Sequence, residues 1–292
     1  MRLSFASSSL LILPVLLVLL ILNLCQIAEV NSARKIAIGN GDEEHLLLPT
    51  HDHDHSSSSS NKNHMDPSLN VFFNPVDLRL GKTMPIYFSK RDPSVSPKLL
   101  SKQDADSIPF SSSNLPYLLE FFSFPQDSPQ AKAIEYTLTQ CDLEPIKGES
   151  RFCATSLESM VDFATALFGS GTQLKVLTTS PLSNTSPLLQ NYTVLETPNE
   201  IHAPRMIGCH TMPYPYAVFY CHSQESENKL YQVWLGGENG ERIHAAAVCH
   251  MDTSQWDSSH VAFQVLGAEP GTSPVCHFFP SDNLVWVPSL PA

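Results

Sequence analysis

The residues with the greatest capacity for chemistry in this sequence are four adjacent cysteine–histidine pairs in its C-terminal third. These pairs are Cys209-His210, Cys221-His222, Cys249-His250 and Cys276-His277. The intervals between successive pairs are 10, 26 and 25 residues. Neutral imidazole is a ligand for copper and zinc, and cysteines in an oxidising compartment form disulfides. The fourfold occurrence of one dipeptide indicates that these eight residues belong to a common site.

Each dipeptide lies in, or at the end of, a segment that reads as a β-strand, namely residues 206–210, 217–222, 242–250 and 275–279. Neighbouring residues of a strand point to opposite faces of the sheet. We therefore expect the cysteines to gather on one face of a sheet and the histidines on the other. That arrangement would keep disulfide chemistry apart from imidazole chemistry.

Three interpretations of the constellation remain open. In the first, the cysteines form disulfides and the four histidines bind a metal, for which Cu(II) is suited. In the second, cysteine and histidine together form structural zinc sites, although zinc fingers use close pairs such as Cys-x2-Cys. In the third, the histidines are hydrogen-bonded polar groups around a disulfide-linked core.

The cysteine count fits an oxidising compartment. Of the seven cysteines, Cys25 lies in the apolar N-terminal segment, and six follow it: Cys141, Cys153, Cys209, Cys221, Cys249 and Cys276. An even number suggests three disulfides, whose connectivity the sequence leaves open. Cys141 and Cys153 close a short loop, and a disulfide there would contribute about 3 kcal/mol. We expect them to form a separate structural pair.

The N-terminus has the pattern of a secretory signal peptide over residues 1–32. Arg2 is followed by an apolar run at 10–22 and by small residues near Ser32. The run is short for a membrane span, which needs about 20 apolar residues. Two sequons, at Asn184 and Asn191, predict N-glycosylation in the secretory pathway.

Residues 33–69 form a polar spacer, and residues 70–292 have the composition of a folded domain. The spacer contains alternating His and Asp at 51–55 and a serine run at 56–60, which cannot pack a core. The whole chain is 42% hydrophobic with a net charge of −12. No basic stripe is present, so nucleic acid is not an expected partner, nor is a membrane after signal cleavage.

The pattern of the domain predicts an α+β fold, with a helical N-terminal part followed by a largely antiparallel β-sheet core. Helices are expected at 115–122, after Ser128, and at 157–168, where Thr155 and Glu158 suggest a capping box. A short strand is expected at 84–88, and further strands from residue 174 onward, including 261–266. Helices first and strands afterwards favour segregated α+β packing.

Other catalytic patterns are weak. No Gly-x-Ser-x-Gly elbow is present, and cysteine and histidine adjacent on a strand point apart. We therefore assign no catalytic residue. Three further histidines are present, His202, His244 and His260. His244 lies on a predicted strand and could join a site, but we expect it to have a surface role.

Several segments of the sequence resemble the plant BURP domain family, over about residues 70–290. Besides the Cys-His spacing, they are Phe72-Phe73, the run from Cys153 to Met160, the run from Tyr214 to His222, and the run from Val275 to Pro280. The short spacer without long repeats is most similar to the unknown-seed-protein-like members.

This resemblance implies a secreted or endomembrane plant protein linked to seed development or stress. It would pass through the Golgi to the cell wall, the apoplast or the protein storage vacuole. Some BURP proteins are copper-dependent peptide cyclases, which join a Trp or Tyr side chain to an unactivated carbon of a core peptide in the same chain. Their histidines correspond to His210, His222, His250 and His277. The spacer here contains no Trp, Tyr or Phe, so no core peptide is evident in cis.

Three functions follow as hypotheses. The leading one is a developmental or stress protein of the secretory pathway with no assigned catalysis and a metal-capable domain. The second is a copper-dependent oxidative enzyme that acts in trans on Tyr- or Trp-containing peptides. The third is a wall-associated module whose partners are pectin or wall proteins.

Overall fold

The computed structural model describes residues 71–88, 94, 96–182 and 189–289 of the 292-residue chain. The expected signal peptide, the spacer and Asn184 lie outside these residues. Within them, no helix is long and apolar enough to cross a membrane.

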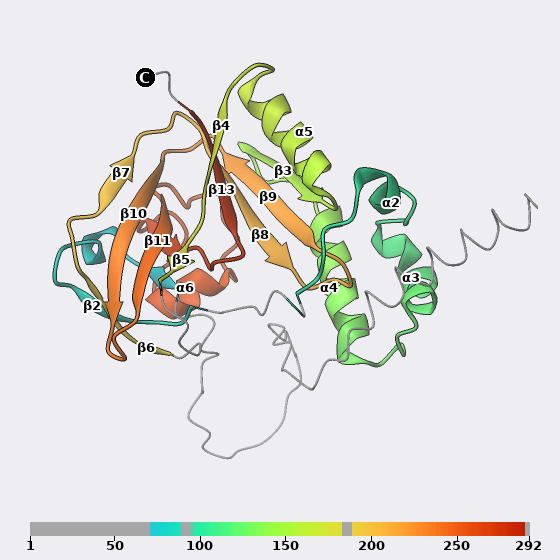
Figure 1. Cartoon of the computed structure of the whole chain (residues 1–292), viewed down its shortest axis with the longest axis horizontal. Coiled ribbons are helices and arrows are strands. Elements are labelled where there is room, and N and C mark those ends of the chain that lie inside the picture. The colour runs from blue at the N-terminus through green and yellow to red at the C-terminus, as the bar shows by residue number, and fades with distance from the viewer. Residues whose placement is uncertain (1–70, 89–93, 95, 183–188, 290–292) are drawn as a thin grey trace, which may run out of the picture. The chain divides into compact units, whose positions relative to one another are not determined.

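Two sheets of antiparallel strands form the core of the domain (Figure 1). The larger has the order β1-β12-β11-β10-β6-β2, with β5 on β11 and β7 on β10. Its strands are β1 (Phe72–Phe73), β2 (Thr83–Ile86), β5 (Ser180–Pro181), β6 (Gln190–Val194), β7 (Asn199–Ile201), β10 (Asn228–Gly237), β11 (Arg242–His250) and β12 (Val275–Phe278). The smaller has the order β3-β9-β8-β13-β4. Its strands are β3 (Glu149–Ala154), β4 (Leu174–Leu177), β8 (Ile207–Met212), β9 (Val218–Gln224) and β13 (Leu284–Pro288).

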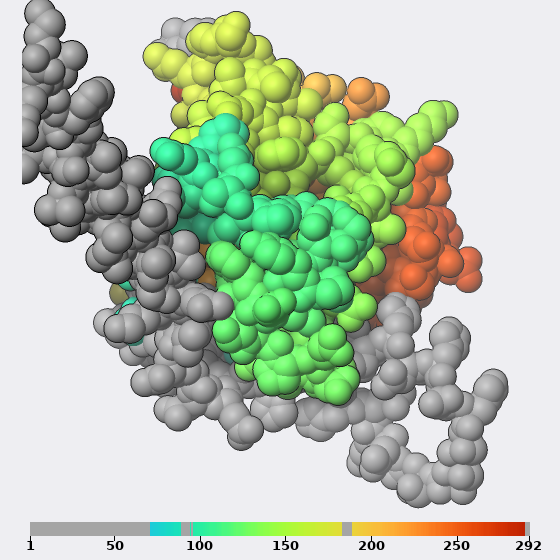
Figure 2. Space-filling view, turned by 90° about the vertical axis from the view of Figure 1, so that its right-hand side faces the viewer, coloured from blue at the N-terminus to red at the C-terminus, as the bar shows by residue number. Residues whose placement is uncertain are grey.

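A few helices accompany the sheets. They are α2 (Lys102–Asp106), α3 (Leu115–Phe122), α4 (Pro129–Asp142), α5 (Leu157–Phe168) and α6 (Val261–Leu266), with 3-10 turns at Pro75–Asp77 and Ser112–Asn114. Helix α5 buries Met160 and Ala164 against the smaller sheet. Figure 2 shows the segment that carries α2, α3 and α4 as a continuous blue-green to green surface on one side of the molecule.

The predicted mixed fold with mostly antiparallel sheets is confirmed, with three corrections. Besides β2, which overlaps the strand expected at 84–88, strands β1 and β3 also precede α5, so helices and strands are not strictly segregated along the chain. The capping box of α5 uses Ser156 and Ser159 instead of Thr155 and Glu158. The strand expected at 261–266 is helix α6, because the His260 side chain caps its start and Gly267 ends it in a left-handed conformation.

The two sheets pack face to face through apolar side chains. Leu230, Ala246 and Val248 of the larger sheet share a buried cluster with Leu177 and Val285 of the smaller sheet. The outer face of each sheet packs in a separate hydrophobic core. On the smaller sheet that outer core lies beneath α5 and contains Cys209 and Cys221. The inner faces therefore present the residues that alternate with the cysteines.

Two disulfides join directly opposed residues of neighbouring strands. Cys209 faces Cys221 in the β8–β9 pair, with a Cα–Cα distance of 4.0 Å. Cys249 faces Cys276 in the β11–β12 pair at 3.9 Å. Such short distances occur at non-hydrogen-bonded sites of antiparallel ladders. These crosslinks fix the register of the four strands that carry the Cys-His dipeptides.

A third disulfide lies away from these strand pairs. Cys141 at the end of α4 is bonded to Cys153 in β3, so the pair expected from sequence spacing is present. It anchors the helical segment to an edge of the smaller sheet.

Candidate metal centre

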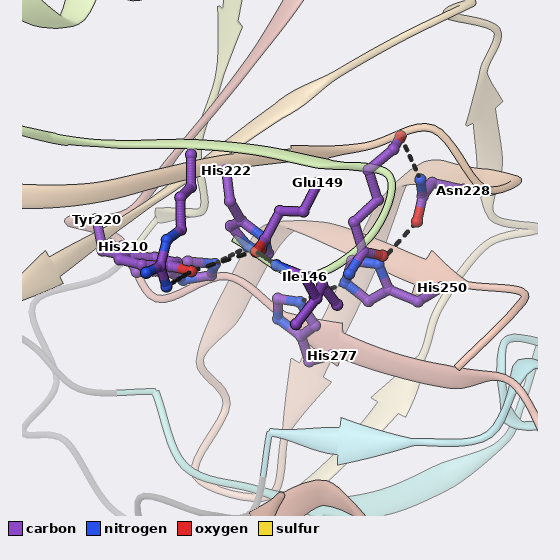
Figure 3. Close-up of polar contacts among 10 residues, drawn as sticks. Ile146, Glu149, His210, Tyr220, His222, Asn228, His250 and His277 are labelled. Carbon is purple, nitrogen blue, oxygen red and sulfur yellow. Dashed lines mark hydrogen bonds and ion pairs between the residues drawn. The ribbon is translucent and has the colours of Figure 1, made fainter. Parts of the chain in front are cut away.

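The four histidines of the dipeptides meet between the inner faces of the two sheets (Figure 3). His210 on β8 and His222 on β9 have ring centroids 5.4 Å apart, and His250 on β11 and His277 on β12 are 5.5 Å apart. Between the sheets, His210 lies 5.6 Å from His277, and His222 lies 6.3 Å from His250. The cysteines are on one side of each sheet and the imidazoles on the other, but two sheets share the constellation, where a single sheet was expected.

The imidazoles form two close pairs. The Nε2 atoms of His210 and His222 are 3.4 Å apart, and those of His250 and His277 are also 3.4 Å apart. Two imidazole nitrogens that bond one ion at about 2.0–2.1 Å are separated by about 2.9–3.4 Å at right-angled to tetrahedral geometry. Each pair therefore has the spacing of two ligands on one ion.

The two pairs do not yet converge on one point. Among the described residues, no group of three or more His, Cys, Asp or Glu side chains is arranged to hold a metal ion as it stands. An ion shared between the pairs needs small rotations of the rings toward one another. The donor chemistry fits copper or zinc, since the neighbouring cysteines are oxidised and only imidazoles face the centre.

Burial keeps three of these imidazoles neutral. Desolvation, reinforced by the neighbouring histidines, holds the pKa of His210 and of His250 well below 6.5. Desolvation and His222 lower the pKa of His277 to about 4, although a backbone hydrogen bond at Phe278 opposes the shift. Neutral imidazole is the form that ligates metal, so at mildly acidic pH each of these rings keeps one nitrogen with a lone pair and an ion need not displace a second proton.

Two polar side chains orient the outward nitrogens of His250 and His222. Asn228 Oδ1 lies 2.7 Å from Nδ1 of His250, and the Asn228 amide donates to the backbone carbonyls of Gln224 and Ser226. Its oxygen therefore faces the ring, Nδ1 of His250 carries the hydrogen, and the inward Nε2 carries a lone pair. Figure 3 shows this contact.

Glu149 supplies the second outward contact. Its Oε1 lies 3.2 Å from Nδ1 of His222, at ion-pair distance but without the alignment of a good hydrogen bond. Burial raises the pKa of the Glu149 carboxyl, but the contact with His222 and a backbone hydrogen bond from Ile146 outweigh it, so that the pKa is lowered. The hydroxyl of Tyr220 also donates to this carboxylate, at 3.4 Å.

Aromatic side chains enclose the centre. Phe279 stacks on His210 and on His277 with centroid distances of 4.9 Å, and Trp256 meets His250 edge-on at 5.0 Å. A cavity of about 20 Å³ remains beside His222, His250 and His277. This is room for about one water molecule. An aromatic peptide side chain does not fit there without movement of the enclosing residues.

The other residues singled out from sequence lie elsewhere, with one exception. Asn191 is exposed on β6 and donates to Glu238 at 2.9 Å, His202 is exposed, and His244 stacks on Trp234. His260 is the exception. Desolvation by neighbouring side chains lowers its pKa, and its ring lies 4.6 Å from Trp256 beside the centre.

His260 is exposed, but its contact with Trp256 places it next to the centre. The sequence did not indicate Glu149, Asn228 or Trp256, because each is an isolated residue in a different part of the chain. Nothing in their sequence spacing connects them to the dipeptides.

Comparisons with known proteins agree with this architecture. The BURP domain family model matches residues 71–288. BURP domain-containing protein BNM2A of Brassica napus is 46% identical over 279 residues, which cover 94% of this chain and 96% of that protein. BURP domain protein USPL1 of Arabidopsis thaliana is 51% identical over 76% of this chain and 81% of its own length. BURP domain protein RD22 of the same plant is 37% identical over 76% of this chain and 57% of its own length. The chain belongs to the BURP domain family of plant proteins.

Proposed function

We propose that this BURP domain binds a copper ion between its two sheets, through the imidazoles of His210, His222, His250 and His277. The observation that carries the proposal is the pair of 3.4 Å Nε2–Nε2 separations on facing strands. Ligand chemistry supports copper, because several neutral imidazoles without a thiolate or carboxylate donor suit Cu(II).

The surrounding residues prepare the ligands in distinct ways. Asn228 and Glu149 hold outward nitrogens, which fixes ring orientation and raises ligand basicity. Phe279 limits the rotation of the two rings on which it stacks. The two strand-pair disulfides keep each histidine pair in register. Bound copper would supply one-electron redox chemistry.

The small volume of the cavity beside the imidazoles, about 20 Å³, supports a role without substrate turnover at the imidazoles themselves. We further propose that the protein acts in the secretory pathway of the plant, in development or stress, as a metal-binding protein of the wall or the storage vacuole. The six paired cysteines support the oxidising route.

The binding proposal is tested on the full chain secreted from an oxidising host. Titration with Cu(II) should give one ion per chain, and His222→Ala or His250→Ala should lower the affinity at least tenfold. His244→Ala is the matched control, because His244 stacks on Trp234 and takes no part in the cluster. Absence of stoichiometric copper in the unaltered protein would overturn the proposal.

One observation favours a second candidate, oxidation of Tyr- or Trp-containing peptides in trans. A cavity of about 280 Å³ lies beside Tyr220 and is also lined by Phe110, Phe152 and Arg151. The Tyr220 ring is 5.4 Å from His222, so this cavity borders the centre on the side of β3. It is large enough for an aromatic side chain.

Formation of one crosslink removes two hydrogen atoms from the peptide, and dioxygen accepts them to give hydrogen peroxide. Copper-loaded protein incubated with aromatic peptides in air should then lower the peptide mass by two hydrogens. Peptides that keep their mass, in a sample that holds copper, would exclude this second function and leave the first intact.

A further inference from the structure

The three disulfides of the domain differ in their exposure to solvent. The cysteines of the two strand-pair disulfides are 0% exposed, namely Cys209, Cys221, Cys249 and Cys276. Cys141 and Cys153 are partly exposed, and both border the cavity of about 280 Å³ beside Tyr220. Because thiol–disulfide exchange requires direct attack on a sulfur atom, the Cys141–Cys153 disulfide is the one of the three that a thiol can reach in the folded protein.

The two strand-pair disulfides are shielded by hydrophobic cores. Cys209 and Cys221 pack among apolar residues beneath α5, and Cys249 and Cys276 lie in the core of the larger sheet. A thiol would reach these sulfur atoms only after a core had opened. The cavity at the third disulfide gives a small thiol direct access instead.

Arg151 places a positive charge near Cys153. The two residues are separated by one position on β3, so their side chains share a face of the strand, and both border the cavity. Nη1 of Arg151 donates to the Tyr220 hydroxyl at 3.5 Å, and Nη2 has no hydrogen-bond partner. Glu149, on the same face of β3, is turned toward His222 at 3.2 Å. The guanidinium therefore favours negative charge on the sulfur of Cys153.

The surroundings of Cys141 have the opposite effect. Cys141 lies in the last turn of α4, where the helix dipole is negative and disfavours an anion. The next residue, Asp142, also borders the cavity, and its carboxylate accepts a hydrogen bond from the Ser112 backbone N–H at 2.8 Å. When a disulfide is cleaved, the sulfur with the more stable thiolate leaves faster. Cys153 is therefore the leaving sulfur, and Cys141 is the sulfur that is attacked.

We propose that the Cys141–Cys153 disulfide is an exchange site for small thiols, which become attached to Cys141 as a mixed disulfide. The incoming thiolate forms a bond to Sγ of Cys141, the bond between the two Sγ atoms breaks, and its electron pair stays on Sγ of Cys153 as a thiolate. A second thiol then attacks the sulfur of the attached molecule, which leaves as a disulfide of the two small thiols. Two thiols are oxidised and one protein disulfide is reduced, without a metal.

The fold retains other contacts that hold the two cysteines in place once the disulfide is open. Strand β3 pairs with β9 along its whole length, from Glu149 to Ala154. Helix α4 is held independently, because the buried hydroxyl of Thr137 donates to the Pro213 carbonyl at 2.7 Å. Exchange at this site therefore does not require unfolding, and the disulfide can form again.

The test uses the full chain without added metal and without oxygen. The protein is exposed to glutathione, quenched with N-ethylmaleimide and mapped by mass spectrometry of unreduced peptides. The first product should carry glutathione on Cys141 and maleimide on Cys153. The two strand-pair disulfides should open about 100-fold more slowly in the absence of denaturant, because a core must open first.

The substitution Arg151→Gln should slow the opening about tenfold, because the leaving thiolate loses its neighbouring positive charge. Arg151→Lys keeps the charge and should restore most of the rate. Arg205→Gln is the matched control, because Arg205 faces Glu225 at 3.6 Å and does not border the cavity. Its rate should equal that of the unaltered protein.

Equal rates of opening for the three disulfides would overturn the proposal. A first glutathione adduct on Cys153, or an unchanged rate in Arg151→Gln, would equally contradict it. Copper uptake and peptide oxidation are measured on separate samples, so the outcome of this experiment is distinguishable from failure of either function proposed above.

Discussion

Each imidazole of the centre has one nitrogen turned inward, and the outward nitrogens have different partners. His250 faces an amide oxygen, His222 faces a carboxylate, and His210 faces the amide NH₂ of Asn283. Polar contacts of this kind, on the far side of a ligand, set its tautomer and basicity. The properties of the site therefore depend on residues outside the Cys-His motif as much as on the motif itself.

Glu149→Gln should weaken Cu(II) binding about tenfold, because an amide is a weaker acceptor than a carboxylate for the His222 hydrogen. Isothermal titration at pH 7 measures the change. Glu200→Gln is the control, since Glu200 lies on β7 and contacts the exposed His202 at 3.8 Å instead of a histidine of the cluster. Equal affinities for the unaltered protein and the Glu149 variant would show that the carboxylate does not support the ligand.

At the scale of elements, the alternation of side chains along a strand was the main basis for predicting the site from the sequence. It predicted that cysteine and histidine of each dipeptide would part to opposite faces, and the four strands do this. It could not predict that β8–β9 and β11–β12 belong to different sheets, because alternation sets the face of a residue and not its sheet. The misassigned segment 261–266 has the apolar residues of a short strand, and only its caps at His260 and Gly267 mark the helix.

Removal of the Cys209–Cys221 disulfide by a double alanine substitution should cost about 3 kcal/mol of unfolding free energy. It should also weaken copper binding, because the β8–β9 register holds His210 beside His222. The Cys141–Cys153 disulfide has the same sequence separation of 12 residues and carries no histidine pair. Its removal should lower stability by a similar amount, as measured by urea denaturation, and leave copper affinity within about threefold. Equal losses of affinity in both variants would contradict the register argument.

At the scale of the whole domain, the two sheets contribute matching halves to one centre. Each half has a disulfide on its outer face and two imidazoles on its inner face, and the apolar cluster around Leu230 and Val285 holds the halves together. The residue types and spacing of the sequence identified these eight residues. Asn228, Asn283 and Glu149 were beyond its reach, because each contacts its histidine from a neighbouring strand or strand end of the same sheet, and the sequence did not predict which strands pair.

The stability of the metal-free domain should fall as the pH drops from about 6.5 toward 4. The pKa of His277 is about 4 in the folded protein and near 6.5 when unfolded. The unfolded chain therefore binds the proton first, and the stability that the neutral ring contributes is complete above pH 6.5 and lost as the pH falls through the folded value. For His277 alone the loss approaches about 3 kcal/mol.

Burial lowers the pKa of His210 and His250 in the same direction, so the three rings act together. Urea denaturation of the metal-free protein at pH 7, 5.5 and 4.5 measures the effect, and His277→Gln should reduce the slope. Bound copper should oppose the loss down to the pH at which protons displace it, because it stabilises the folded state alone. A metal-free domain whose unfolding free energy stays constant over this range would show that the imidazoles are hydrated in solution and that the packed centre opens to water.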